Sequence, residues 1–172
     1  MRDKMLSPAP GEFKSPAGRN AQMVPDGPRR YVVQQHELSA FRHWDLMLEQ
    51  TQSLATWQLG VPPELVAASA EPEALAAAAP LDTQGIPAKR LADHRKAYLD
   101  YEGPISGDRG EVHIVDSGTY TLLAADETEW LIEVAGRVLR GRFRLVRRGE
   151  TPDGWRLIRC RGDAAERARR GT

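Results

Sequence analysis

Short segments rich in β-branched and aromatic residues recur along most of this chain and constrain its fold more than any other feature. Such segments are typical of strands, and the glycine, proline and polar residues between them are typical of turns. We expect roughly eight strands, at residues 31–36, 43–49, 54–59, 110–116, 119–123, 130–134, 138–146 and 155–160. This pattern predicts a mainly β fold, a compact antiparallel β-barrel with a short Ala-rich helical insertion.

Turn residues and alternation add detail to this expectation. Residues 117–118, a Ser-Gly pair, are expected to form a turn between two strands. Residues 135–136, an Ala-Gly pair, are expected to join the strands 130–134 and 138–146 in a hairpin. The latter strand carries arginines at alternate positions, which would place them on one face of the sheet.

Three parts of the chain lack a strand pattern. Residues 1–28 contain five prolines and no apolar periodicity, so we expect a disordered N-terminal arm. Residues 64–80 are rich in alanine and predict a short helical insertion that ends at Pro80. Residues 163–172 form a charged tail. The expected single domain, the β-barrel, therefore covers residues 29–162.

Composition excludes several classes of protein. A single cysteine excludes an internal disulfide framework. The chain has neither an apolar run long enough to span a bilayer nor the apolar stretch of a secretory signal, so we expect a cytoplasmic protein with no membrane partner. The formal net charge is +0, yet twelve arginines and only four acidic residues follow residue 136. This basic part either contacts a polyanion or is a solvated tail, and the sequence favours neither interpretation.

Two histidines and an aspartate lie close together in the early strands: His36, His43 and Asp45. His43 and Asp45 share a face because side chains alternate along a strand, and a hairpin over residues 38–41 would bring His36 to the same place. Two imidazoles and a carboxylate suit a divalent metal such as Mn²⁺, Zn²⁺ or Fe²⁺. Each histidine alone is more often a hydrogen-bonded structural residue, but the cluster favours a metal site.

A third histidine, His94, lies in a polar stretch that is expected to form a loop. An exposed histidine there could protonate a leaving group or hold a phosphate, and Arg90 could bind a phosphate with two hydrogen bonds. From the residues alone, an ordinary surface loop is the better interpretation. The fourth histidine, His113, alternates with apolar residues in a strand and is expected to be structural or solvent-facing, whereas Asp116 is expected to be a turn residue.

Several of these segments together resemble a known family, the 3′-phosphoesterase domain found at the N-terminus of many bacterial DNA ligase D proteins. The resemblance runs from about residue 30 to residue 160. We expect this chain to be a stand-alone form of the domain. It is carried by the segments Val32–His36, His43–Glu49, Leu54–Trp57, Lys89–Leu91, Asp93–His94, Tyr98, Asp100–Ile105, Asp116–Tyr120, Leu139–Phe143 and Trp155–Ile158.

The resemblance implies a small β-barrel that uses manganese to process 3′ ends of nucleic acid. Members of the family remove a terminal ribonucleoside and then the 3′-phosphate left behind, in DNA repair. By this likeness His36, His43 and Asp45 match the metal ligands. His94 matches a histidine at the scissile phosphate, and Arg90 and Tyr98 match residues of the same pocket. The implied partners are 3′ ends of DNA, with or without terminal ribonucleotides, and a repair ligase or polymerase in trans.

The chain also departs from the family pattern. Met47 stands where an arginine is typical, and Val61 stands near an expected lysine, so two cationic phosphate contacts are missing. Arg42, Arg95 or Lys96 could compensate. If none does, the rate would fall by several orders of magnitude, because each charged hydrogen bond contributes about 1.5–3 kcal/mol.

The departures leave three functions open. The leading one is a metal-dependent phosphoesterase that acts on nucleic-acid 3′ ends. The second is a catalytically weak or inactive metal-binding module that binds nucleic-acid ends or a repair partner. The third is a different metal hydrolase that acts on a small phosphate ester.

Overall fold

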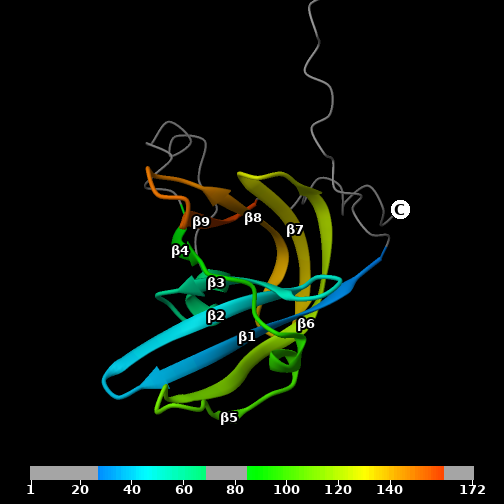
Figure 1. Ribbon diagram of the computed structural model, residues 1–172. Helices are drawn as coiled ribbons and strands as arrows, with labels where there is room; N and C mark the ends of the chain where they lie inside the picture. The colour runs from blue at the N-terminus through cyan, green and yellow to red at the C-terminus, as the bar shows by residue number, and fades with distance from the viewer. Residues whose placement is uncertain (1–26, 69–84, 161–172) are drawn as a thin grey trace, which may run out of the picture.

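The computed structural model describes residues 27–68 and 85–160 of the chain (Figure 1). Most of the expected N-terminal arm, the alanine-rich segment after residue 68 and the charged tail lie outside the described residues. The first part of the expected helical insertion is present as α1 (Pro63–Ala68), with a proline in its first turn. Within the described ranges no helix is long and apolar enough to cross a membrane.

The described residues form one antiparallel sheet that closes on itself. Its order is β1-β2-β3-β4-β9-β8-β7-β6-β5, and β1 also pairs with β6, which closes the ring (Figure 1). The predicted mainly β, antiparallel fold is therefore confirmed. The strands are β1 (Arg29–Leu38), β2 (Phe41–Glu49), β3 (Leu54–Leu59), β4 (Ile86–Arg90), β5 (Gly103–Pro104), β6 (Glu111–Ala125), β7 (Glu129–Gly136), β8 (Arg140–Arg147) and β9 (Gly154–Arg159).

The predicted turn at residues 117–118 is wrong, because β6 runs through it without a break. Gly118 pairs with Tyr31 of β1 on one side and with Gly136 of β7 on the other. A Cβ atom on Gly118 would lie 2.3 Å from the carbonyl oxygen of Ala135. The glycine is therefore required by the close approach of neighbouring strands and not by a turn.

Two strands were not expected from the sequence. In β4, Pro87 has no backbone N–H to donate to a neighbouring strand, so the sequence of this segment is more typical of a loop. The structure accommodates it because β3 pairs only with the last three residues of β4. β5 has two residues and pairs with the start of β6. Arg90 therefore ends a strand, and the loop that carries His94 begins after it.

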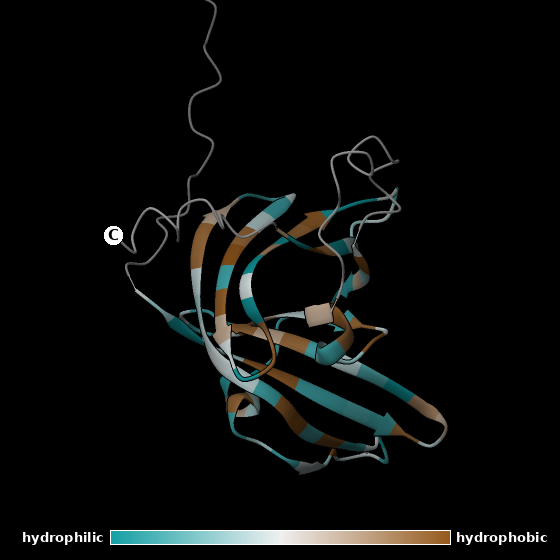
Figure 2. Ribbon diagram, turned by 180° about the vertical axis from the view of Figure 1, so that it is seen from behind, coloured by the Kyte–Doolittle hydropathy of each residue, from teal (hydrophilic) through white to brown (hydrophobic). Residues whose placement is uncertain are grey.

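The strands β1 to β3 carry buried apolar residues on both faces of the sheet, in two separate clusters. Figure 2 shows how hydrophobic and hydrophilic residues are distributed along the strands. Inside the ring, the inner cluster is built around Trp57 and includes Tyr31, Leu46 and Phe143. Outside the ring, a second and smaller group forms. This outer cluster consists of Val32, Met47, Leu54 and Leu99, with Tyr98 and Ile114 packed against it.

The outer cluster positions a segment that crosses the outside of the sheet. The 3-10 helix η3 (Lys96–Leu99) contacts β1 and β2, and Leu99 is its buried residue. Two carbonyls of this segment, those of Tyr98 and Tyr101, accept hydrogen bonds from the buried amide of Gln34 on β1, at 2.8 and 2.7 Å. Residues 94–106 therefore lie over the outer face of β1 and β2.

Arginines of β8 follow the predicted alternation. Phe143 and Leu145 are buried, whereas Arg142 and Arg144 pair with acidic residues of β7. Arg144 donates twice to Glu129, at 2.6 and 2.9 Å, and the Arg142 guanidinium lies 3.5 Å from Glu133. These acids offset part of the positive charge that the sequence concentrates in this half of the chain.

A buried carboxylate ties β1, β6 and the β7–β8 connection together. Asp116 is 1% exposed and accepts hydrogen bonds from the Tyr31 hydroxyl at 2.6 Å and from the backbone N–H groups of Val138 and Leu139 at 2.9 Å. Burial, and then the hydrogen bond to Asp116, raise the pKa of Tyr31 well above its ordinary value, so this hydroxyl remains a donor. Asp116 is thus a structural residue within a strand and not the turn residue that the sequence predicted.

We expect Asp116→Ala to lower the free energy of unfolding by about 3 kcal/mol or more, because it removes a charged acceptor from three donors. Urea denaturation with linear extrapolation measures this change. Glu111→Ala, an exposed position on the same strand, is the matched control and should change stability by less than about 0.5 kcal/mol. Equal stability of the two variants would contradict the proposed role of Asp116.

Candidate metal centre

The hairpin of β1 and β2 builds the candidate metal centre. Its two-residue turn begins at Ser39, whose φ of 53° is the left-handed conformation that such turns need. From this turn the register places His36 directly opposite His43, and Gln34 opposite Asp45. All four side chains lie on the outer face of the sheet, because residues that pair in an antiparallel ladder share a face. The predicted meeting of the two histidines across a hairpin is confirmed.

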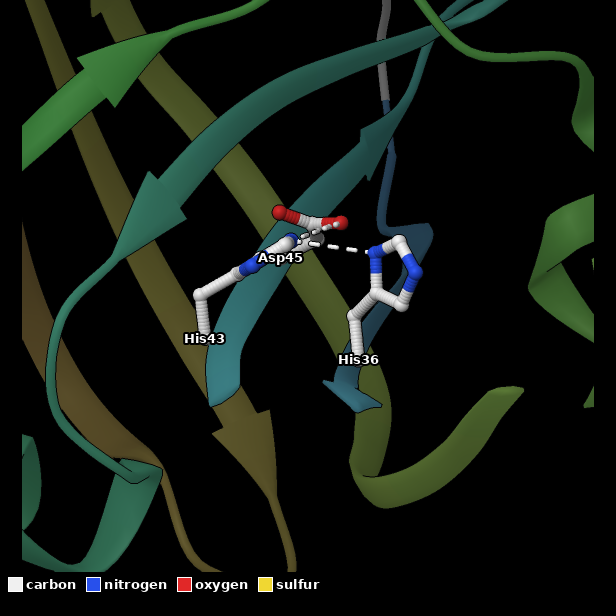
Figure 3. Close-up of side chains that lie close together, drawn as sticks. All are labelled: His36, His43 and Asp45. Carbon is white, nitrogen blue, oxygen red and sulfur yellow. Dashed lines mark hydrogen bonds and ion pairs between the residues drawn. The ribbon is translucent and has the colours of Figure 1, made fainter. Parts of the chain in front are cut away.

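The three predicted ligands converge. His36 Nδ1 lies 3.1 Å from His43 Nε2, and His43 Nε2 lies 3.6 Å from Asp45 Oδ2 (Figure 3). One ligand atom of each residue lies within 4.8 Å of the others. The histidines are half-buried and Asp45 is 5% exposed. This arrangement could hold one metal ion.

The hydrogen bonds of the cluster fit a cation better than an internal network. Asp45 Oδ1 is buried and has no hydrogen-bond partner among the described residues, which is costly for a carboxylate. His36 Nε2 donates to the carbonyl of Arg109, so that His36 Nδ1 carries a lone pair toward His43. Such a contact at the outer nitrogen is typical of histidines that bind metals. A divalent cation between the three residues would be bound by the His36 lone pair and by the Asp45 carboxylate, whose Oδ2 faces His43.

His94 belongs to a different element and lies outside this group of three. Its backbone N–H and C=O pair with Leu54 at the start of β3, at 2.9 and 2.8 Å. Its Nδ1 lies 3.0 Å from the carbonyl of Ala92 and donates to it, which leaves Nε2 available for another partner. The ring packs edge-on against Tyr98, with 5.7 Å between the ring centroids. The structure therefore brings His94 and Tyr98 together on the segment that covers the outer face.

Gln34 connects this segment to the metal cluster, and sequence analysis did not single it out. It is 1% exposed, it faces Asp45 across the hairpin, and its amide holds the carbonyls of Tyr98 and Tyr101. Its position next to Val32 on the outer face could have indicated a buried amide, because Val32 is fully buried there. Through Gln34 the metal cluster and the Tyr98 segment become parts of one surface.

A comparison with protein families identifies this scaffold. The sequence model of the DNA ligase D 3′-phosphoesterase domain matches residues 34–147, about two thirds of the chain. The chain belongs to this family. No match is found among curated proteins. The matched stretch contains the whole candidate metal cluster and the loop of His94.

In this phosphoesterase domain Arg90 supports the His94 loop. Its guanidinium lies 4.7 Å from the ring centre of Trp57 and donates to the carbonyls of Thr56 and Leu91 and to Asp93. Partial burial raises the pKa of Asp93, but hydrogen bonds from Ser53 and Arg90 outweigh this effect and hold the pKa below its ordinary value. These contacts give Arg90 a positioning role toward the loop, and its predicted contact with a phosphate stays a prediction.

The two departures from the family pattern have structural explanations. Met47 is fully buried in the outer cluster, beneath Leu99. Val61 is half-buried and packs against the inner cluster. Both positions therefore contribute apolar contacts and offer no charge to a phosphate.

Three nearby cations, Arg42, Lys96 and Arg95, could replace the positive charges that Met47 and Val61 do not provide. Arg42 pairs with Glu37 at 2.6 Å, and both side chains lie on the face opposite to the metal cluster. Lys96 pairs with Glu49 at 2.9 Å. The Arg95 guanidinium lies 5.9 Å from the ring centre of Tyr98, on the segment that faces the site. Arg95 is the best placed of the three.

We expect Mn²⁺ to raise the thermal unfolding midpoint of the wild-type protein. At a free Mn²⁺ concentration a hundredfold above the dissociation constant, the added stability should be about 2.7 kcal/mol. Asp45→Asn should remove this shift. The same variant without metal should be no less stable than wild type, because it replaces a buried carboxylate that has one oxygen without a hydrogen-bond partner. His113→Ala, an exposed histidine on β6, is the control and should keep the shift. A full shift for Asp45→Asn would exclude this cluster as the metal site.

The low pKa of Asp93 predicts a pH effect. A carboxyl group whose pKa is lower in the folded state stabilises that state at neutral pH, and the contribution is lost as the pH falls through the folded-state pKa. Because this ion pair is largely exposed, the effect should be at most about 1 kcal/mol. Thermal midpoints from about pH 6 to about pH 3 should therefore fall less for Asp93→Asn than for wild type or for the exposed loop variant Asp108→Asn. Parallel pH profiles for all three proteins would contradict this expectation.

Proposed function

We propose that this protein is a metal-dependent phosphoesterase that processes 3′ ends of DNA and of DNA with terminal ribonucleotides, in DNA repair. The observation that carries the proposal is the group of His36, His43 and Asp45, with its unsatisfied carboxylate oxygen, on the scaffold of a 3′-phosphoesterase family. The proposed metal is Mn²⁺, because the resemblance to the family implies it. Zn²⁺ and Fe²⁺ also suit two imidazoles and a carboxylate.

The ligand set would leave coordination positions open. A divalent cation held there would polarise a phosphoryl oxygen or activate a water molecule. His36 is oriented for this task by Arg109, and Asp45 by its burial at the base of the hairpin. Hydrolysis of a 3′-phosphate would give inorganic phosphate and a 3′-hydroxyl group.

His94 is proposed as the proton donor or phosphate contact. With Nδ1 bonded to the carbonyl of Ala92, Nε2 is the nitrogen that can reach a substrate oxygen. Tyr98 packs against the ring and restricts its orientation, and Arg90 holds the loop through Asp93. We assign Tyr98 to the same pocket on this basis.

The products suggest the partners. A 3′-hydroxyl group is what a polymerase extends and what a ligase joins, so a repair polymerase or ligase in trans would use the processed end. The substrate itself is polyanionic, and the exposed arginines Arg140 and Arg147 of β8 could contact its backbone.

A second function is favoured by the two apolar positions Met47 and Val61. Since Met47 and Val61 offer no charge, the phosphate has fewer cationic contacts than the family pattern provides. A protein with the metal site intact but a weak phosphate contact would bind nucleic-acid ends with little or no turnover. The experiment below separates the two functions.

The test uses labelled primer–template substrates on an end-resolving gel. One primer ends in a 3′-phosphate and another in a single ribonucleotide, each with and without Mn²⁺. We expect metal-dependent dephosphorylation and shortening by wild type, and at least a hundredfold lower rate for His94→Ala, since general acid–base catalysis contributes about 10²–10⁴. His43→Ala should show no turnover at the Mn²⁺ concentrations at which wild type is active.

His113→Ala is the matched control and should retain the wild-type rate. Binding of these ends without any product, at every metal concentration, would favour the inactive end-binding module. Full turnover by His43→Ala would contradict a catalytic role for the metal cluster.

A further inference from the structure

A pocket of about 290 Å³ opens on the same side of the sheet as the candidate metal centre. It lies between η3 and the loop that follows β5, on the segment that covers the outer face of β1 and β2. Its volume is at the lower end of the range for small-molecule sites, so it suits a ligand of modest size. The lining residues are Arg95, Ala97, Tyr98, Tyr101, Pro104, Ile105 and Ser106.

Two contacts join the pocket to the metal cluster. Gln34, which faces Asp45, donates to the carbonyls of the lining residues Tyr98 and Tyr101. Arg109 accepts a hydrogen bond from His36 through its carbonyl and donates through Nε to the carbonyl of Ser106, at 2.8 Å. Gln34 on the strand side and Arg109 on the loop side therefore connect the lining of the pocket to the cluster.

The chemistry of the lining is aromatic and cationic. The rings of Tyr98 and Tyr101 pack edge-to-face with 5.9 Å between centroids, and Tyr101 is 39% exposed. The Arg95 guanidinium stands 5.9 Å from the centre of the Tyr98 ring. Pro104 and Ile105 add apolar surface, and no acidic residue is among the lining residues.

Acidic residues next to the pocket are committed elsewhere. Asp100 forms an ion pair with Arg30, and Glu102 accepts a hydrogen bond from the backbone N–H of Ile114, at 2.7 Å. The pocket therefore favours a flat aromatic group that is attached to an anion, because rings and a guanidinium stack on such a group while the positive charge attracts the anion.

We propose that this pocket binds the base of a nucleotide at or next to the 3′ end of a nucleic acid. The assignment rests on the proposed function, because it places the phosphate of that nucleotide toward His94 and the metal cluster. His94 contacts Tyr98, so one ring borders both the base pocket and the reacting phosphate. Stacking is tolerant of sequence, since every base has an aromatic face. A base held in the pocket cannot pair with a template, so the pocket selects ends that are single-stranded or frayed.

The test removes the base from the ligand and leaves the protein unchanged. Fluorescence anisotropy would measure binding of the full chain, with Mn²⁺, to single-stranded DNA that ends in a 3′-hydroxyl group and so cannot be dephosphorylated. An abasic residue is placed at the last, the next-to-last or a central position. We expect at least a fivefold loss of affinity at the last or next-to-last position, and less than a twofold change at the central position or on exchange of one base for another.

Protein variants locate the effect. Tyr101→Ala should weaken binding of the intact strand at least fivefold and should bind intact and abasic ends equally well. Tyr101→Phe keeps the ring and loses the hydroxyl contact with the carbonyl of Pro104, so it should bind as wild type does. Leu123→Ala, which removes a similarly exposed apolar side chain from the far end of β6, is the control.

Each remaining outcome decides one question. Equal affinity of wild type for intact and abasic ends would overturn the base pocket, whether or not the gel assay shows turnover. A base-dependent affinity with no turnover would support the pocket and reject the proposed catalytic function. If adenosine 3′-phosphate bound as tightly as the strand and depended equally on Tyr101, the pocket would serve free nucleotides, and the assignment to a nucleic-acid end would fail.

Discussion

The pairing of β1 with β2 is the constraint on which the candidate site depends. A shift of this hairpin by one residue would turn His43 and Asp45 to the inside of the ring and bring Trp44 and Leu46 to the outside. The register is held from both directions, by the two-residue turn after Leu38 and by the apolar residues that alternate between the inner and outer clusters. β1 also pairs with β6, where Asp116 fixes Tyr31, so the strand that carries His36 is restrained on both edges. The geometry of the candidate metal cluster is thus determined by β1, which is paired on both of its edges.

Substitution of the expected arginine by Met47 has a consequence beyond the loss of a charge. Met47 joins the outer cluster that holds Leu99, and with it the segment that carries Tyr98 and Tyr101. An arginine at this fully buried position would need a buried partner. Met47 therefore contributes apolar packing under η3, and Arg95, which directly precedes this helix, lines the aromatic pocket. This packing helps to hold the covering segment in place without a charged contact at position 47.

The sequence allowed prediction of those parts of the site that depend on local alternation. The face shared by His43 and Asp45 and the return of His36 through a hairpin both follow from the period of a strand. The errors arose where contacts between distant segments decide the outcome. Gly118 was assigned to a turn because nothing in its neighbourhood shows that Gly136 approaches it from another strand. Gln34 was missed for the same reason, since its hydrogen-bond partners lie more than sixty residues away in the chain.

The candidate site lies on the outside of the ring, whereas apolar side chains pack on the inside. Trp57, Tyr31 and Phe143 form this interior together with aliphatic residues of the described strands. On the outer face, β1 and β2 present polar ligands at the end near the hairpin and apolar residues further along, where the covering segment packs. In the proposed function, a substrate would lie at the border between these two regions, with the candidate metal cluster on one side and His94 and Tyr98 on the other. Such an open border admits the end of a polymer, which an enclosed pocket inside the ring would exclude.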